Sequence, residues 1–175
     1  MRIVAGKFKG RDLVSPGNTP IRPTAELVRA GMLDMLADDL EGARVLDLFA
    51  GTGALGLEAM SRGAKTADFL EIHPSGLHAL KANIGLLRLK DRTRVFKRDA
   101  LPFAAAQEKN RYDIAFADPP YESRMLDRLI ETWNTVGFSR ILVVEHAKTH
   151  KLPPGVQRRA FDDSIVTIYR ELPAD

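Results

Sequence analysis

Apolar positions along the chain fall into short blocks that alternate with longer amphipathic ones. The short blocks are typical of buried strands and cover 43–49, 66–72, 93–100, 112–118 and 140–146. The longer blocks repeat every three to four residues and predict helices over 53–63, 74–87, 101–109 and 124–136. Strands and helices in regular alternation predict a parallel sheet with helices on both faces.

The two ends of the chain depart from this alternation. Two strand-like runs in 155–172 surround a turn that begins at Asp162, too close together for a crossover helix, so we expect them to pair antiparallel at one sheet edge. The segment 2–16 predicts a short β-hairpin that turns at its glycines. We therefore expect an α/β, Rossmann-like, doubly wound fold with a mostly parallel seven-stranded sheet. It would be one domain over 1–175, with 1–24 as a basic extension within it.

A helix over 25–40 is expected to join this extension to the first strand. Thr24 suits its N-cap, because a hydroxyl there can accept a hydrogen bond from the first turn. The apolar residues expected on its inner face are Leu27, Met32, Met35 and Leu36.

Composition narrows the class of protein. The 175 residues, 45% of them hydrophobic, suit one globular domain with a full core. The chain has no cysteine, which excludes disulfides and thiolate metal sites, and its four histidines show no metal-ligand spacing. No apolar run reaches the roughly 18 residues that a membrane span needs. We expect a cytoplasmic monomer without a metal.

Positive charge gathers near the start of the chain, although the formal net charge is only +3. The cations of this region are Arg2, Lys7, Lys9, Arg11, Arg22 and Arg29. One interpretation is a surface that binds RNA phosphates. The alternative is a solvated edge whose charges discourage aggregation. Charge alone does not separate the two.

A glycine-rich turn follows the first predicted strand. Gly51, Gly53 and Gly56 satisfy the pattern G-x-G-x-x-G, and Glu71 stands twenty residues after the first of them. Taken alone, this is the fingerprint of a dinucleotide site, in which the acid binds ribose hydroxyls. Asp47 argues against that interpretation, because a carboxylate at the end of the strand would repel a pyrophosphate.

A cofactor with a cationic ammonium and sulfonium, and no phosphate, would instead be attracted by Asp47. S-adenosylmethionine is such a cofactor, and Glu71 could still accept hydrogen bonds from its ribose. Asp99, after the third predicted strand, is placed to accept from the adenine amino group. Other residues assigned to this cofactor site are Phe49, Ile72 and Ala100.

The fourth predicted strand ends in the sequence FADPPYE. An exocyclic amine on a nucleobase is a poor nucleophile, so an enzyme that methylates it must orient its lone pair. The Asp118 side chain and the Pro119 carbonyl could hold the two amine hydrogens, while Pro120 keeps the turn stiff. Tyr121 offers a flat face for an extruded base. A structural proline turn is the alternative.

The segments VLDLFAGTGALGLEAMSRGA and FADPPY resemble class I methyltransferases that modify exocyclic amines. With GKFKGRDL and IRPTAELVRAGMLDML, the chain resembles the bacterial RsmD family of 16S ribosomal RNA guanine-N2 methyltransferases from Arg2 to about Arg170. The resemblance implies that Asp118 to Tyr121 are catalytic and that the substrate is 16S rRNA in an assembled or assembling 30S particle. It also implies that Arg22 and Thr24 border the cofactor and the target nucleotide.

The chain departs from the family pattern at three positions. His73 stands where an acid is usual, and Ala30 and Leu33 replace a glutamate and a phenylalanine of the helix. Three rivals stay open on sequence alone: an adenine-N6 methyltransferase of DNA or RNA, an oxidoreductase using NAD, and a non-catalytic RNA-binding assembly factor.

Overall fold

The computed structural model describes the backbone of residues 1–17, 23–119 and 124–171. Seven strands form one sheet in the order β3-β2-β1-β4-β5-β7-β6. The strands are β1 Arg44–Asp47, β2 Thr66–Leu70, β3 Thr93–Phe96, β4 Tyr112–Ala117, β5 Ser139–Ala147, β6 Gln157–Ala160 and β7 Ser164–Arg170. The helices are α1 Pro23–Asp34, α2 Ala54–Ser61, α3 Pro74–Leu86, α4 Ala100–Ala105 and α5 Met125–Val136, with 3₁₀ turns at Ala37–Asp39 and Lys90–Arg92.

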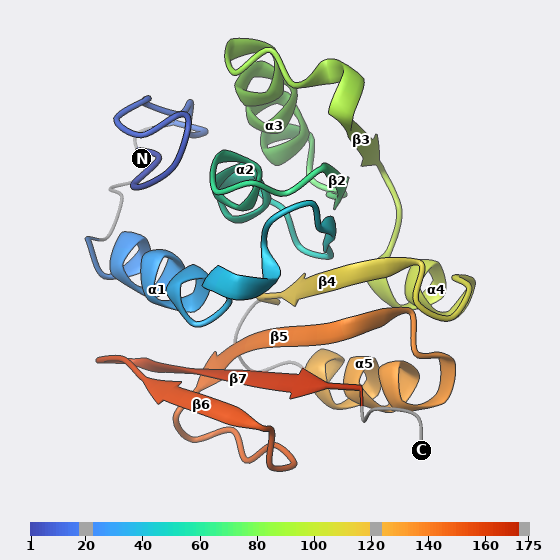
Figure 1. Cartoon of the computed structure of the whole chain (residues 1–175). Coiled ribbons are helices and arrows are strands. Elements are labelled where there is room, and N and C mark those ends of the chain that lie inside the picture. Colours follow the sequence, from blue (N-terminus) through green and yellow to red (C-terminus); the bar gives the residue numbers. More distant parts are fainter. Residues whose placement is uncertain (18–22, 120–123, 172–175) are drawn as a thin grey trace.

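The sheet is parallel from β3 to β5 and antiparallel beyond it. β7 pairs antiparallel with β5, and β6 pairs antiparallel with β7 at the edge (Figure 1). The strand order reverses between β1 and β4, which is the switch point where doubly wound folds bind ligands. The expected fold class and C-terminal hairpin are therefore confirmed.

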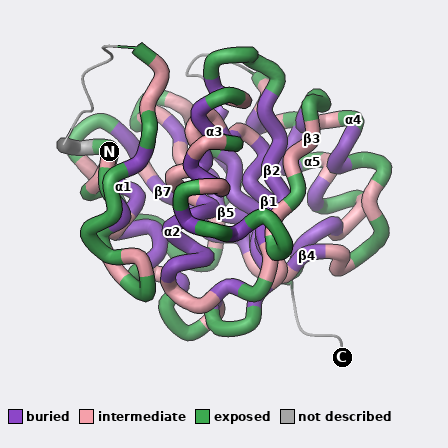
Figure 2. Tube along the Cα trace, turned by 90° about the horizontal axis from the view of Figure 1, so that it is seen from above, coloured by how far each residue is buried: buried purple, intermediate pink, exposed green. Residues whose placement is uncertain are grey.

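Helices cover both faces of the sheet, and each face has its own apolar core. Buried residues of α1, α2 and α3 pack on one face, against side chains such as Val45 and Phe116. Buried residues of α4 and α5 pack on the other face, against the neighbouring side chains Leu46 and Ala115. Successive strand residues thus serve opposite cores, because side chains alternate across a strand. Figure 2 shows the buried strands in the interior with exposed turns around them.

The helix before β1 differs from the prediction in start and phase. It begins at Pro23, so Thr24 lies within its first turn and is not the N-cap. Leu27 is 67% exposed, whereas Val28, Met32 and Leu33 are buried. The buried face of the helix thus begins at Val28, one residue later than the predicted start at Leu27. A pattern that mixes Leu, Val and Met on several sides does not fix the phase of a helix.

The N-terminal segment forms a tight loop with a single antiparallel bridge in place of the expected hairpin. The bridge joins Arg2 to Asp12, and backbone hydrogen bonds join Ile3 to both Gly10 and Arg11. No further β-pairing follows in the described part of the loop, because its backbone groups turn instead toward the helices. Figure 1 shows the loop beside α1, α2 and α3 rather than at a sheet edge.

Candidate active site

Four acidic residues lie at or beyond the carboxyl ends of parallel strands. Asp47 ends β1, Glu71 follows β2, and Asp118 follows β4. Asp47 pairs in register with Phe116, so Asp118 extends past the end of the neighbouring strand at the same sheet edge. Asp99 lies three residues beyond β3 and precedes α4 with an exposed side chain. The acids predicted from strand ends thus share the carboxyl end of the sheet, with Asp47 and Asp118 at the switch point.

The glycine loop wraps the end of β1 and leads into α2. Gly51 and Gly53 adopt φ of 53° and 81°, in the left-handed region that favours glycine. The Gly56 N–H donates to Asp47 Oδ2 at 3.2 Å. A Cβ at Gly56 would lie 2.4 Å from the Phe69 ring, so the third glycine serves the close packing of α2 on β2.

Glu71 is held rigidly beside this loop. Its two carboxylate oxygens accept hydrogen bonds from the N–H groups of Gly51 and His73, each at 2.7 Å. A Cβ at Gly76 would lie 2.9 Å from the Glu71 carboxyl carbon, so α3 also needs a glycine there. Each carboxylate oxygen has a second lone pair, which leaves acceptors for hydroxyl groups of a ligand. His73 contributes its backbone here, and its side chain is exposed.

Carboxyl groups of three adjacent strands gather at the carboxyl end of the sheet, around the switch point, and we call this region the crevice. Asp47 is 3% exposed, and burial raises its pKa to about 7. Desolvation also raises the pKa of Asp118, to about 8, with further contributions from the charges of Glu145 and Asp47. The Asp118 side chain is exposed to solvent, which reduces the desolvation part of this shift, whereas the two neighbouring carboxylates raise the pKa in the same direction.

Glu145 is a residue that the sequence analysis missed. It lies near the end of β5, where Val144 pairs with Ala117, so it stands beside Asp118. Every charged neighbour that shifts the pKa of Asp47 or Asp118 is another carboxylate. Such a crevice fits a cationic ligand and disfavours a pyrophosphate. The sequence did contain a signal for Glu145, because it is an acid near the end of a predicted strand, as Asp47 and Asp118 are.

The remaining predicted cofactor residues lie around this crevice with different exposures. Phe49 is half-buried and packs against the core of α4 and α5. Ala100 is buried in the first turn of α4, whereas Ile72 is 44% exposed after β2. Pro119 is buried, and Pro120 and Tyr121 lie outside the described residues. Their contacts with a cofactor or base stay predictions.

The residues predicted to bind RNA have different surroundings in the structure. Lys7, Lys9 and Arg11 are exposed on the N-terminal loop. Arg2 is exposed but forms an ion pair with Asp12, 2.9 Å between Nε and Oδ1. Arg22 lies outside the described residues, and only the backbone of Thr24 is described.

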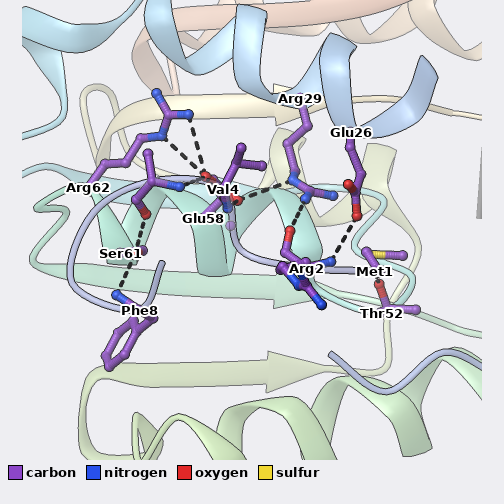
Figure 3. Close-up of polar contacts among 12 residues, drawn as sticks. Met1, Arg2, Val4, Phe8, Glu26, Arg29, Thr52, Glu58, Ser61 and Arg62 are labelled. Carbon is purple, nitrogen blue, oxygen red and sulfur yellow. Dashed lines mark hydrogen bonds and ion pairs between the residues drawn. The ribbon is translucent and has the colours of Figure 1, made fainter. Parts of the chain in front are cut away.

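The prediction for Arg29 is wrong. Its side chain is only 7% exposed and donates to the Glu58 carboxylate and to the Arg2 carbonyl. Glu58 is fully buried in α2, and it also accepts the N–H groups of Val4 and Ala5 (Figure 3). Arg29 thus fastens the N-terminal loop to the domain. The sequence did hint at this pairing, because Glu58 is the lone acid within the apolar block 54–61 and a buried carboxylate needs a partner.

Comparison with known proteins places the chain in a family. A family model described as Conserved hypothetical protein 95 matches residues 1–167. The chain is 34% identical to ribosomal RNA small subunit methyltransferase D of Escherichia coli K12, over 87% of this chain and 78% of that protein. The protein of the same name from Haemophilus influenzae is 33% identical over 74% of this chain and 68% of its own. The chain belongs to the RsmD family.

Solved structures agree with membership of the RsmD family. A hypothetical protein of Thermus thermophilus superposes with a TM-score of 0.80 at 31% identity, covering 98% of this chain and 99% of that one.

The RsmD-family chain has no group of three or more metal-binding side chains among its described residues. None of the helices described is long and apolar enough to cross a membrane.

Proposed function

We propose that this RsmD-family protein transfers a methyl group from S-adenosylmethionine to the N2 amine of a guanine in 16S rRNA. The observation that carries the proposal is the cluster of carboxyl groups of Asp47, Asp118 and Glu145 on the adjacent strands β1, β4 and β5, with Glu71 beside it. The cluster suits a cofactor that carries positive charge and no phosphate. Membership of the RsmD family supports rRNA as the acceptor.

The cofactor would lie across the glycine loop. Asp47 faces its cationic part, and Gly51 and Gly53 let the backbone approach closely. Glu71 accepts from the ribose hydroxyls through lone pairs that its backbone donors leave unused. Asp99, whose carboxylate is exposed beyond β3, accepts from the adenine amino group. Ile72, Phe49 and Ala100 supply the apolar surroundings of the adenine.

Asp118 and Pro119 would orient the acceptor amine. The cofactor, when bound, supplies an electrophilic methyl group on a sulfonium. The Asp118 carboxylate and the Pro119 carbonyl accept the two hydrogens of the amine and turn its lone pair toward that methyl group. Because both acceptors follow directly from β4, the sheet fixes their geometry before the substrate arrives. Tyr121 provides the face on which the guanine stacks.

Asp118 also suits the removal of a proton. The nitrogen forms a bond to the methyl carbon, the sulfur keeps the electron pair of the broken bond, and positive charge passes from sulfur to nitrogen. A carboxylate is favoured while the sulfonium is present, and its protonated form is favoured once that charge has gone. The neighbouring carboxyl groups that raise the pKa of Asp118 therefore help it to take the proton from the amine.

The acceptor is proposed to be 16S rRNA within a small subunit that is assembled or being assembled, in the cytoplasm, with the enzyme acting as a monomer. The test is incubation of the protein with labelled S-adenosylmethionine and 30S particles from a strain that lacks this methyltransferase. The label should appear on guanine N2 in 16S rRNA. Label on adenine, or on DNA in preference to rRNA, would overturn the substrate assignment. Asp118→Ala controls for a contaminating activity.

A further inference from the structure

A groove of about 510 Å³ lies between the N-terminal loop and the turn that follows α3. The loop contributes Lys7, Phe8 and Arg11. The turn contributes 86–89, and Arg92 follows at its end. Two segments about eighty residues apart in the sequence therefore form its two sides, and both carry cations.

The loop side of the groove is fixed to α2. The Lys7 N–H donates to the Ser61 carbonyl at 2.7 Å, and the Phe8 N–H donates to Ser61 Oγ at 2.9 Å. Figure 3 shows the Phe8 backbone held by Ser61 in this way. The backbone approaches so closely that a Cβ at Gly6 would lie 2.0 Å from the Ser61 carbonyl oxygen. The loop also reaches α3, where the buried Asn83 side chain bonds to the N–H and carbonyl of Val14. The cations of the loop are thus held on a rigid support.

The helix side places an arginine where glycine is favoured. Arg88 has φ of 56°, in the left-handed region. Its N–H donates to Gly85, and the Leu89 N–H donates to Ile84, which is the hydrogen-bond pattern of a Schellman motif with Arg88 at the C′ position. A glycine there would avoid the cost of this conformation. The position therefore keeps a charged side chain at the expense of stability.

The groove combines free charge with apolar surface. Lys7, Arg11 and Arg88 are exposed and form no ion pair with a described residue. Arg92 differs, because its guanidinium donates to the carbonyls of Ala64 and Lys65 and is fixed there. Leu86 is 44% exposed, and Lys7 Nζ lies 5.6 Å from the centre of the half-buried Phe8 ring. Cations beside an aromatic ring and apolar surface suit a nucleic acid backbone with unpaired bases.

The groove lies at the opposite end of the sheet from the crevice. α3 starts just after Glu71, at the crevice, and runs for 13 residues before it reaches the groove. At the helical rise per residue this separation is about 20 Å. Arg92 leads directly into β3, and Ser61 ends α2, so both sides of the groove belong to the amino ends of the strands. Lys7 and Arg11 of the loop therefore lie about 20 Å from the end of the sheet that carries the crevice.

We propose that this groove binds the sugar–phosphate backbone of a second RNA segment, distant from the segment that enters the crevice. This inference rests on the proposed function, since it assumes that RNA is the substrate. Recognition then requires RNA that is folded so as to present two segments about 20 Å apart. An isolated strand carrying the target guanine would fill the crevice and leave the groove empty.

The test compares two triple variants with equal loss of charge. The groove variant is Lys7→Gln, Arg11→Gln and Arg88→Gly. The control variant is Lys109→Gln, Arg111→Gln and Arg140→Gln, which removes three cations at the amino ends of β4 and β5, away from the groove. Binding to 30S particles that lack the methyl group is measured over a series of salt concentrations, together with cofactor affinity.

The groove variant should bind the particles at least about tenfold more weakly, and its salt slope should fall by roughly two to three units, because each lost phosphate contact removes about one. Cofactor affinity should not change. The control variant should bind like the wild type. Equal weakening by both variants would mean that only net charge matters and would overturn the proposal. So would weakening on particles but not on protein-free 16S rRNA that the wild type still methylates, because the groove would then bind a ribosomal protein.

Two further readouts keep the result interpretable. Arg88→Gly alone should raise Tm while it weakens binding, so a loss of affinity cannot be attributed to a damaged fold; unchanged affinity with raised Tm would contradict the proposal. If the wild-type protein does not methylate rRNA at all, the proposed function fails. If the wild type methylates rRNA and the groove variant binds like it, only the groove assignment fails.

Discussion

Asp47 offers a quantitative test of the acidic crevice. Asp47 is 3% exposed, the pKa of its carboxyl group is raised to about 7, and no described cation neutralises it. Asp47→Asn replaces it with a neutral side chain of the same shape whose one oxygen can still accept from a backbone N–H, either of Gly56 or of Phe49. The cost of burying a charge is removed by this change, and the packing is kept.

The sign of the effect follows from proton linkage. The pKa of Asp47 is higher in the folded state than in the unfolded state, where it is 3.8. Folding therefore favours the protonated carboxyl group. The stability that this preference contributes is complete below the unfolded pKa and is lost as the pH rises through about 7. The folded pKa lies about two pH units above pH 5, and each unit changes the free energy of unfolding by about 1.36 kcal/mol. Over this range the wild type should therefore lose about 3 kcal/mol of stability relative to the variant.

Urea unfolding of the cofactor-free protein at pH 5 and pH 8 measures this difference. The free energy of unfolding of Asp47→Asn, relative to that of the wild type, should be about 3 kcal/mol higher at pH 8 than at pH 5. Asp68→Asn is the matched control, because Asp68 is also buried but is paired with Arg94 and Tyr112. That control should be destabilised at both pH values. A difference between Asp47→Asn and the wild type that does not change with pH would refute the reasoning.

The same variant tests the charge of the ligand. If Asp47 faces a cation, wild-type affinity for S-adenosylmethionine should increase from pH 6 to pH 8, as the carboxyl groups ionise. Affinity for S-adenosylhomocysteine, which lacks the sulfonium charge, should increase less. Asp47→Asn should keep only the part of this preference that the Asp118 carboxylate supplies. Retention of the full preference by the variant would show that another group recognises the sulfonium.

Three other changes test separate parts of the structure. Asp118→Ala should lower kcat by at least about 100-fold in single-turnover methylation, with cofactor affinity largely kept, because it removes the acceptor of the amine; lost cofactor binding would mean that its role is misplaced. Glu58→Ala should cost about 3–5 kcal/mol in urea unfolding because Arg29 is left buried without its partner, and a surface-like cost below 1 kcal/mol would contradict that burial. Gly56→Ala should cost about 1–3 kcal/mol by the same measurement, since a Cβ there meets the Phe69 ring, and a neutral change would show that α2 can move.

The strands and the acids at their ends were predictable because each depends on local sequence. An apolar block followed by an acid, glycine or proline marks the end of a parallel strand, and the sheet then brings these ends together. Asp47 and Asp118 are examples, since the pairing of β1 with β4 places them at one edge. Helix phase was less predictable, and the exposed Leu27 shows why. Several phases satisfy the same apolar composition.

The roles of the cations could not be predicted from the sequence. Arg29 and Lys7 look alike in an N-terminal basic segment, yet one is buried against Glu58 and the other is exposed on a groove. What separates them is a partner far along the chain, which no local pattern shows. The groove itself joins Arg11 to Arg88 and therefore exists only once the loop has docked on α2 and α3.

The crevice gathers carboxyl groups and the groove gathers cations, and this arrangement constrains how RNA approaches. The carboxyl groups at the crevice repel a phosphate backbone, so a segment cannot lie along the crevice floor with its phosphates inward. A neutral base, swung out from its backbone, can enter without that repulsion. The backbone must then be held elsewhere, and the exposed cations of Lys7, Arg11 and Arg88 are at the other end of the sheet. The acidic crevice therefore favours an extruded base, and the basic groove favours an RNA whose fold supplies a second segment.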